Sequence, residues 1–188
     1  TMKSINNFIG LALLSGALLT SCSDSFLQRD SLTESSSNTF WQTPDDALMA
    51  LASCYDALQS NQLYNSDQYS LGRLYMDCIS DNGGHFNWSG WMEGYDMAMG
   101  IHTPSSSIIG SYWKDCYEVI SRCNVLIANI DRVDMDASQK AIYQAEAKTI
   151  RALMYINLTM TYQDVPFLTA PLTIDEAECE KTDRAAIV

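Results

Sequence analysis

Apolar residues recur at intervals of three and four along three stretches of the chain, which is the spacing of one helix face. The first stretch follows Thr43, a good N-cap residue, and Pro44, which suits the first helical position. It runs to about Ser60, and we expect its apolar face to consist of Leu48, Leu51, Ala52, Tyr55 and Leu58. A weaker helical pattern covers residues 68–79.

The other two stretches are longer, and a short polar turn at residues 131–136 separates them. One follows Ser105, Ser106 and Ser107, and its apolar positions are Ile108, Ile109, Tyr112, Trp113, Cys116, Ile120, Cys123, Ile127 and Ile130. The apolar positions of the other are Ile142, Ala145, Ile150, Leu153, Ile156 and Met160. It ends before Pro166, because the residue before a proline resists the helical region. Two long helices joined by a short turn predict an antiparallel hairpin, and without a convincing strand pattern the fold class is all-α.

Residues 81–104 show neither a helical nor a strand period. Five of the nine glycines of the chain lie there: Gly83, Gly84, Gly90, Gly94 and Gly100. A connection of this length without regular structure is uncommon in a compact domain and is usually functional or disordered. The sequence therefore predicts a long Gly-rich loop between the first helix and the hairpin.

The N-terminal segment has the three-part layout of a secretory signal. Lys3 precedes a mostly apolar run at residues 8–19, which is shorter than the about 20 apolar residues that span a bilayer. The alternative, a buried core helix, is disfavoured because no polar face interrupts the run. We expect residues 1–21 to be a signal peptide and residues 22–39, rich in Ser, Asp and Thr, to be a tether.

Residues 19–22 (LTSC) resemble a bacterial lipobox, in which the cysteine receives a diacylglycerol and becomes the new N-terminus. Two acyl chains on one residue give durable membrane anchoring, whereas a single chain binds marginally. We expect Cys22 to be lipidated, so that the protein is exported and held at a membrane.

Charge excludes one class of partner. Eleven Lys and Arg stand against 23 Asp and Glu, for a net charge of −12. Binding to a phosphate backbone depends on clustered basic residues, and the sequence shows no such cluster. Nucleic acid is therefore not an expected partner, and the same charge opposes adhesion of the polypeptide to anionic lipid.

Five cysteines follow Cys22, an odd number that cannot all pair within the chain. Cys116 and Cys123 fall on one predicted helix, about 10 Å apart at 1.5 Å per residue, which is too far for a disulfide. No CxxC or His/Cys ligand spacing occurs. We expect these cysteines to act as small buried apolar residues and expect no metal site.

Four segments together resemble the SusD/RagB family of outer-membrane nutrient-binding lipoproteins. They are residues 40–47 (FWQTPDDA) with Tyr55, 113–124 (WKDCYEVISRCN), 145–155 (AEAKTIRALMY) and 162–166 (YQDVP). In the last segment Gln163 replaces the usual glycine of the family, which puts the local turn geometry in question. The resemblance extends along nearly the whole chain.

Membership of that family implies tetratricopeptide-like helical hairpins in a protein much longer than this chain. Residues 40–188 are then the N-terminal helical domain, incomplete at its C-terminus. The resemblance also implies a surface lipoprotein of the outer membrane that captures a glycan and delivers it to a TonB-dependent, SusC-like transporter. It implies binding without catalysis and no cofactor.

The Gly-rich loop carries the candidate glycan-binding residues. Four aromatic residues fall within ten positions: Phe86, Trp88, Trp91 and Tyr95. Flat aromatic faces stack on sugar rings, and hydroxyl groups need polar partners of the kind nearby: Asp81, Asn82, His85 and Asn87. The family resemblance assigns glycan contacts to this place, first of all to Trp88 and Trp91. The alternative is that these rings cap the helical core or contact the transporter.

Other residues of the motifs are expected to be structural. Trp41 and Trp113 lie on predicted apolar stripes and should pack in the core. Asn124 and Arg151 are expected to support the fold, and we expect Arg151 to meet Asp115 or Glu118 across the hairpin.

Catalysis finds little support in the sequence. His85 and His102 are the only histidines, and neither an HExxH nor a GxSxG motif occurs. Residues 77–83 (DCISDNG) fail as a calcium loop because Ile79 stands where an oxygen ligand is required. A second functional class, a helical-repeat module that binds peptide or protein and no sugar, remains open.

Overall fold

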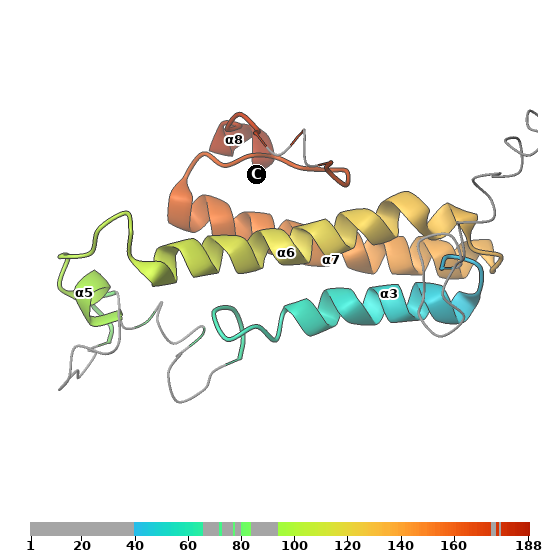
Figure 1. Cartoon of the computed structure of the whole chain (residues 1–188), viewed down its shortest axis with the longest axis horizontal. Helices are drawn as coiled ribbons and strands as arrows, with labels where there is room; N and C mark the ends of the chain where they lie inside the picture. Colours follow the sequence, from blue (N-terminus) through green and yellow to red (C-terminus); the bar gives the residue numbers. More distant parts are fainter. Residues whose placement is uncertain are drawn as a thin grey trace, which may run out of the picture. The chain divides into compact units, whose positions relative to one another are not determined.

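The computed structural model describes residues 40–65, 72, 77, 80–83, 94–173, 176 and 178–188. The chain divides into two units, Thr1–Phe40 and Trp41–Val188, and the elements below belong to the second. They are the helices α3 (Pro44–Ala57), α5 (Gly94–Ala98), α6 (Ser107–Asn129), α7 (Ala137–Tyr162) and α8 (Arg184–Ile187), with the 3-10 helix η1 (Ile130–Arg132) (Figure 1). The described part of the chain is all-α, as predicted, with one isolated bridge between Val165 and Thr182.

Helix α3 begins where the sequence indicates. The Thr43 side chain accepts a hydrogen bond from the backbone N–H of Asp46 at 3.3 Å, and the Asp46 carboxylate accepts one from the backbone N–H of Thr43 at 2.8 Å. This reciprocal capping box satisfies donors that the first helical turn leaves without partners. Pro44 stands at the first helical position, where a missing N–H costs nothing.

Helices α6 and α7 form the predicted antiparallel hairpin, and α3 packs against both (Figure 1). The turn between them contains η1, and α7 begins at the N-cap Asp136, whose carboxylate accepts from the backbone N–H groups of Ser138 and Gln139. The predicted apolar stripe of α6 is largely correct, because six of its members are buried: Ile108, Tyr112, Cys116, Ile120, Cys123 and Ile130.

The predicted faces of the other two helices were wrong in part. On α3, three of the predicted positions, Leu48, Ala52 and Tyr55, are exposed, and the buried positions are Ala47, Leu51, Cys54 and Ala57. On α7, five of the six predicted positions are exposed: Ile142, Ala145, Leu153, Ile156 and Met160. The face of α7 that packs instead contains Ala147, Ile150, Met154, Leu158 and three polar or aromatic residues, Tyr155, Asn157 and Thr159. Each helix carries two apolar faces, and periodicity alone does not decide which one is covered.

Three of the four described cysteines confirm the prediction of small buried residues, whereas Cys179 is only half-buried. Cys54 on α3 and Cys116 and Cys123 on α6 are free thiols in the core between the helices. None of the described helices is both long enough and apolar enough to span a bilayer.

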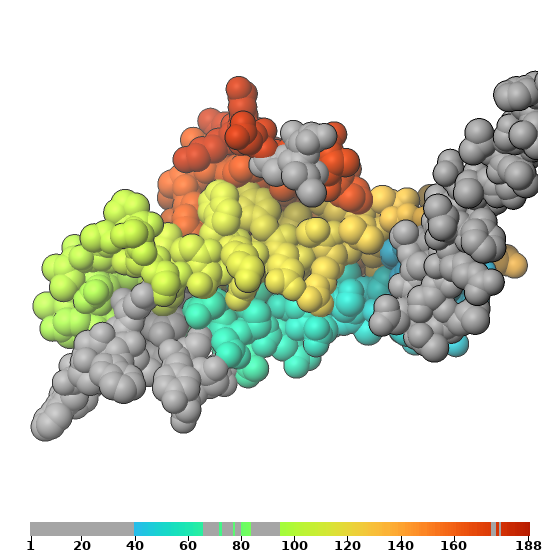
Figure 2. Space-filling view, viewed as in Figure 1, coloured from blue at the N-terminus to red at the C-terminus, as the bar shows by residue number. Residues whose placement is uncertain are grey.

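The chain after α7 returns over the α6–α7 pair (Figures 1 and 2). It turns at Gln163, whose φ of 66° is in the left-handed region. Val165 then pairs with Thr182, whose N–H donates to the Val165 carbonyl at 3.0 Å. Polar side chains of α6 and α7 bind the backbone of residues 166–170 and hold this segment against both long helices.

Candidate functional site

Most of the predicted glycan-binding residues lie outside the described part of the chain. These are His85, Phe86, Asn87, Trp88 and Trp91, and the predicted lipidation site Cys22 lies outside it as well. The assignments for these residues therefore stay predictions.

Three members of the predicted set are described. Asp81 and Asn82 are exposed in one turn, where the backbone N–H of Asn82 donates to the Ser80 hydroxyl at 3.2 Å. Tyr95 is half-buried on α5. The side chains of the turn are thus accessible to a ligand, and Tyr95 keeps part of its ring open to solvent.

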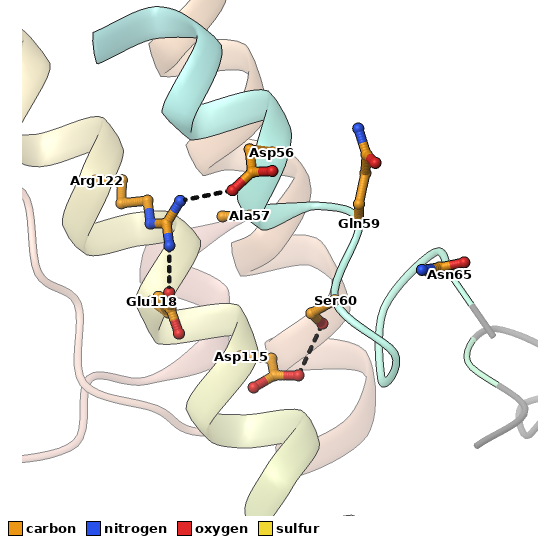
Figure 3. A pocket seen from close by; sticks show the side chains of 8 residues that line it. All are labelled: Asp56, Ala57, Gln59, Ser60, Asn65, Asp115, Glu118 and Arg122. Carbon is orange, nitrogen blue, oxygen red and sulfur yellow. Dashed lines mark hydrogen bonds and ion pairs between the residues drawn. The ribbon is translucent and has the colours of Figure 1, made fainter. Parts of the chain in front are cut away.

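A polar pocket of about 340 Å³ lies at the C-terminal end of α3, against the side of α6 (Figure 3). Its lining residues are Asp56, Ala57, Gln59, Ser60, Asn65, Asp115, Glu118 and Arg122. Asn65 is the last residue of the continuously described stretch 40–65. The pocket therefore lies where the end of α3 and the short segment after it meet α6.

Arg122 organises one wall of this pocket. Its Nη1 donates to the Asp56 carboxylate at 3.2 Å and to the backbone carbonyl of Ser53 at 2.9 Å, while its Nη2 donates to Glu118 at 2.6 Å. Burial opposes the charge of the guanidinium, but the two carboxylates outweigh it and raise the pKa of Arg122. The arginine thus ties the end of α3 to α6.

Ser60 also lines the pocket, and its hydroxyl donates to the Asp115 carboxylate at 2.7 Å (Figure 3). The pocket lining combines three carboxylates, two amides and a hydroxyl with a single arginine, so its net charge is negative. Such groups can accept from and donate to ligand hydroxyls. No cluster of three or more potential metal ligands occurs among the described residues.

The sequence analysis did not predict this pocket, although the sequence contains part of the pattern that would indicate it. Asp115, Glu118 and Arg122 are spaced by three and four residues, which places them on one face of α6. The contribution of Asp56 and Ser60 depends on how α3 packs, which the sequence does not show.

A second pocket, of about 290 Å³, lies between α7 and the returning segment, which is the part of the chain that follows α7. Its lining combines apolar residues, among them Tyr155 and Phe167, whose rings pack edge to face with centroids 4.9 Å apart, with the cationic side chains of Lys148 and Arg151.

The family motifs on α6 and α7 hold the returning segment through its backbone. Asn124 is buried, and its Nδ2 donates to the carbonyls of Leu168 and Ala170 at 3.0 and 3.2 Å. The Arg151 Nη1 donates to the Asn124 Oδ1 at 2.6 Å and to the Thr169 carbonyl at 3.1 Å. The structural role expected of both residues is confirmed. The expected contact of Arg151 with Asp115 or Glu118 is wrong, because Asp115 binds Ser60 and Glu118 binds Arg122.

Tyrosines complete this anchorage. The Tyr117 hydroxyl donates to the Pro166 carbonyl at 2.7 Å, and burial raises its pKa, so the donor stays protonated at neutral pH. The Tyr162 hydroxyl donates to the Ile109 carbonyl at 2.6 Å. Trp113 lies between these two rings, with centroids at 4.9 and 5.0 Å, and is half-buried, whereas Trp41 is fully in the core as predicted.

A family model described as starch-binding and associating with the outer membrane, of the SusD-like type, matches residues 26–187. The chain belongs to the SusD-like family. The resemblance of the four motifs is thereby confirmed, and the helical, tetratricopeptide-like fold is the one that SusD-like proteins share.

Two curated SusD-like proteins of Formosa agariphila, P25 and P38, are each 29% identical to the chain. The matches cover 83% and 88% of this chain but 30% and 31% of those proteins. The chain thus spans about three tenths of the length of these curated SusD-like relatives.

Solved structures of the family show the same arrangement. A SusD-like carbohydrate binding protein from Bacteroides fragilis is 30% identical, with a TM-score of 0.65 over 79% of this chain and 29% of its own. A laminarin binding SusD-like protein is 27% identical, with a TM-score of 0.67 over 78% of this chain and 32% of its own.

Proposed function

We propose that the SusD-like protein to which this chain belongs binds a glycan at the outer membrane and passes it to a SusC-like, TonB-dependent transporter. The observation that carries the proposal is the family match over residues 26–187. The laminarin binding neighbour, which is similar over most of this chain, supports a polysaccharide as the ligand class. The protein acts by binding, without catalysis.

In this proposal the Gly-rich loop supplies the sugar contacts. Trp88 and Trp91 provide stacking surfaces, with Phe86 and Tyr95 beside them, because C–H faces of sugars pack on aromatic rings. Asp81, Asn82, His85 and Asn87 bind the hydroxyl groups. The polar pocket at the end of α3 offers further hydrogen-bonding groups for ligand hydroxyls.

Membrane attachment follows from the N-terminal segment. Lipidation of Cys22, which becomes the new N-terminus when residues 1–21 are removed, anchors the protein, and the polar tether 23–39 separates it from the membrane surface. Metabolic labelling with an alkyne palmitate analogue should mark the wild type and Cys179→Ala but leave Cys22→Ala unmarked. Equal labelling of all three would contradict attachment at Cys22.

Native affinity electrophoresis tests the ligand class and the site together. Gels that contain laminarin or starch should retard the wild type. Trp88→Ala and Trp91→Ala should each weaken the affinity measured from this retardation by about 5- to 150-fold, because about 1–3 kcal/mol of ring stacking is lost.

Met99→Ala provides the control, since Met99 is exposed just beyond α5 and should leave the retardation unchanged. Retardation that both tryptophan variants keep would remove the loop from the site. Binding to oligopeptides and to none of the polysaccharides in a thermal-shift screen would replace the glycan with a peptide ligand.

A further inference from the structure

The second pocket, between α7 and the returning segment, differs in charge from the pocket at the end of α3. Two cationic side chains line it, Lys148 and Arg151, and none of its lining side chains is acidic. The whole chain, by contrast, has 23 Asp and Glu against 11 Lys and Arg. Both cations lie on one face of α7, because residues three positions apart are neighbours on a helix surface. The pocket is therefore a cationic concavity in an acidic protein.

The two cations have hydrogen-bonding capacity that the fold does not use. The Arg151 Nη1 is occupied, since it donates to the Asn124 Oδ1 at 2.6 Å and to the Thr169 carbonyl at 3.1 Å. A guanidinium has five N–H donors, and the three on Nη2 and Nε have no partner in the part of the chain that the structure describes. The exposed ammonium of Lys148 has none there either. Both ion pairs among the described residues belong to Arg122, so an anion in this pocket would meet two cations without a carboxylate partner.

An aromatic ring stands beside these cations. Phe167 lines the pocket and is 43% exposed, and its ring is held by an edge contact with the buried ring of Tyr155, at an interplanar angle of 63°. Such a ring offers a flat apolar face to the C–H groups of a sugar. The volume of about 290 Å³ is at the lower end of the range of about 300–1,000 Å³ for small-molecule sites, which suits one sugar residue better than a longer segment of glycan.

We propose that this pocket is a subsite for a uronic acid residue of an acidic glycan. The carboxylate of the sugar accepts from the guanidinium of Arg151 and the ammonium of Lys148, and the sugar ring lies against Phe167. The inference rests on the proposed glycan-binding function and adds to it the charge of the ligand. Because the net charge of −12 repels polyanions, an acidic glycan that binds this protein needs a local cationic site of this kind.

Isothermal titration calorimetry with matched ligands tests the charge requirement. Oligogalacturonate and its methyl ester have the same sugar backbone, but only the acid carries carboxylates, and oligomers from alginate provide uronic acids of other stereochemistry. The full chain is titrated in a buffer that contains a chelator, so that calcium cannot bridge acidic groups. We expect at least one of the acidic oligomers to bind, and the oligogalacturonate to bind more tightly than its methyl ester if it is the one that fits.

A lysine variant assigns the binding to this pocket. Lys148→Gln should weaken the binding of the acidic oligomer by about 3- to 10-fold, because a charge-assisted hydrogen bond at a partly exposed position is lost. Lys114→Gln is the control, since Lys114 is also exposed but lies on α6 outside the pocket, and the change in net charge is the same. It should bind as the wild type does.

Protection of lysines from acetylation gives a second readout on the wild type, which does not depend on how a variant folds. The protein is treated with an N-hydroxysuccinimide ester of acetate, with and without the acidic oligomer, and digested with chymotrypsin for mass spectrometry. We expect the oligomer to slow the acetylation of Lys148 and to leave that of Lys114 unchanged. Equal protection by free acetate at the same carboxylate concentration would overturn the proposal, because the sugar ring would then contribute nothing.

The outcomes separate this subsite from the proposed function. Binding of laminarin oligomers with no binding of any acidic oligomer would overturn the subsite and leave the glycan-binding function in place. Equal affinity losses in Lys148→Gln and Lys114→Gln would likewise overturn the subsite alone. Absence of binding to every neutral and acidic oligomer would overturn both.

Discussion

Gln163 ends α7 with a backbone conformation that suits glycine. Its φ of 66° and ψ of −108° are sterically unfavourable for a residue with a Cβ atom. The family motif at this point has glycine, so the departure noted in the sequence has a structural cost. The chain makes the turn nevertheless, because the contacts that hold residues 165–170 against α6 and α7 impose it.

Replacement of Gln163 by glycine should therefore stabilise the protein. Removal of the Cβ strain exceeds the entropy that glycine adds to the unfolded chain, and we expect the free energy of unfolding to rise by about 1 kcal/mol. Urea denaturation measures the change. Gln163→Ala is the control, because it also removes the side-chain bond to Arg184 but keeps the Cβ atom, and it should show no gain. Destabilisation by glycine would contradict the strain at this position.

The Asn124–Arg151 pair provides a second test at single residues. Because Asn124 is 2% exposed and binds two carbonyls as well as Arg151, a double-mutant cycle of Asn124→Ala and Arg151→Ala should give a coupling of about 1–3 kcal/mol. The chain contains a matched control, the exposed pair of Arg132 and Asn129 joined at 2.9 Å. The coupling there should be below about 0.5 kcal/mol. Equal couplings in the two cycles would show that burial adds nothing to the anchorage.

At the scale of the helix, α7 shows that helical periodicity can predict the exposed face as the buried one. Its exposed apolar residues follow helical spacing as well as its buried ones do, and its covered face includes polar residues, Asn157 and Thr159, that a hydrophobic pattern omits. The Thr159 hydroxyl bonds the Tyr155 carbonyl of its own helix, which removes the penalty of its burial.

Neighbouring residues on α7 separate the two faces experimentally. Met154 is 0% exposed and Leu153 is 39% exposed. Met154→Ala should lower the free energy of unfolding by about 2–4 kcal/mol, because it leaves a cavity in the core, whereas Leu153→Ala should cost well under about 1 kcal/mol. Chemical denaturation of the two variants measures both values. A larger loss for Leu153→Ala would reverse the assignment of the faces.

Much of the fold was predictable because its signals are local. Thr43 and Pro44 mark the start of α3, the polar turn at residues 131–136 separates α6 from α7, and both follow from capping and turn chemistry. The covered face of α7 and the pocket of Asp56, Ser60 and Asp115 depend on how helices meet, which local patterns do not contain. The sequence located candidate ligand residues in the loop by composition, and those outside the described part stay predictions.

For the molecule as a whole, the chain covers about three tenths of the length of its curated relatives and leaves an apolar face of α7 in solvent.

Three carboxylates in separate parts of the described structure stabilise the folded state. Asp46, Asp136 and Glu176, from three separate places, have lowered pKa values because each carboxylate accepts hydrogen bonds from nearby backbone and hydroxyl groups, with Thr43, Ser138 and Thr173 as the leading partners.

These lowered pKa values predict how stability depends on pH. The unfolded chain takes up the protons near the ordinary values of 3.8 and 4.5, and the folded protein takes them up at lower pH. The stabilisation is therefore complete above about pH 5 and is lost as the pH falls through the folded-state values. Asp46→Asn should be less stable than the wild type at pH 6 and should converge with it toward pH 2 to 3 in urea titrations. Asp45→Asn, a change in the same turn, should show a smaller pH-dependent difference; equal behaviour would remove the capping box as the cause.

The Tyr155 hydroxyl donates to the carbonyl of Leu168 at 3.0 Å and accepts from the N–H of the same residue at 2.6 Å. The single hydroxyl of Tyr155 thus satisfies both backbone groups of Leu168, as a neighbouring strand does in a sheet. Asn124, Arg151 and Tyr117 also bind backbone atoms of this segment. Since none of these contacts depends on the side chains at 168–170, that stretch is free to diverge between homologues without shifting along the helices. The side chains of residues 168–170 can therefore change during evolution while the hydrogen bonds to their backbone are kept.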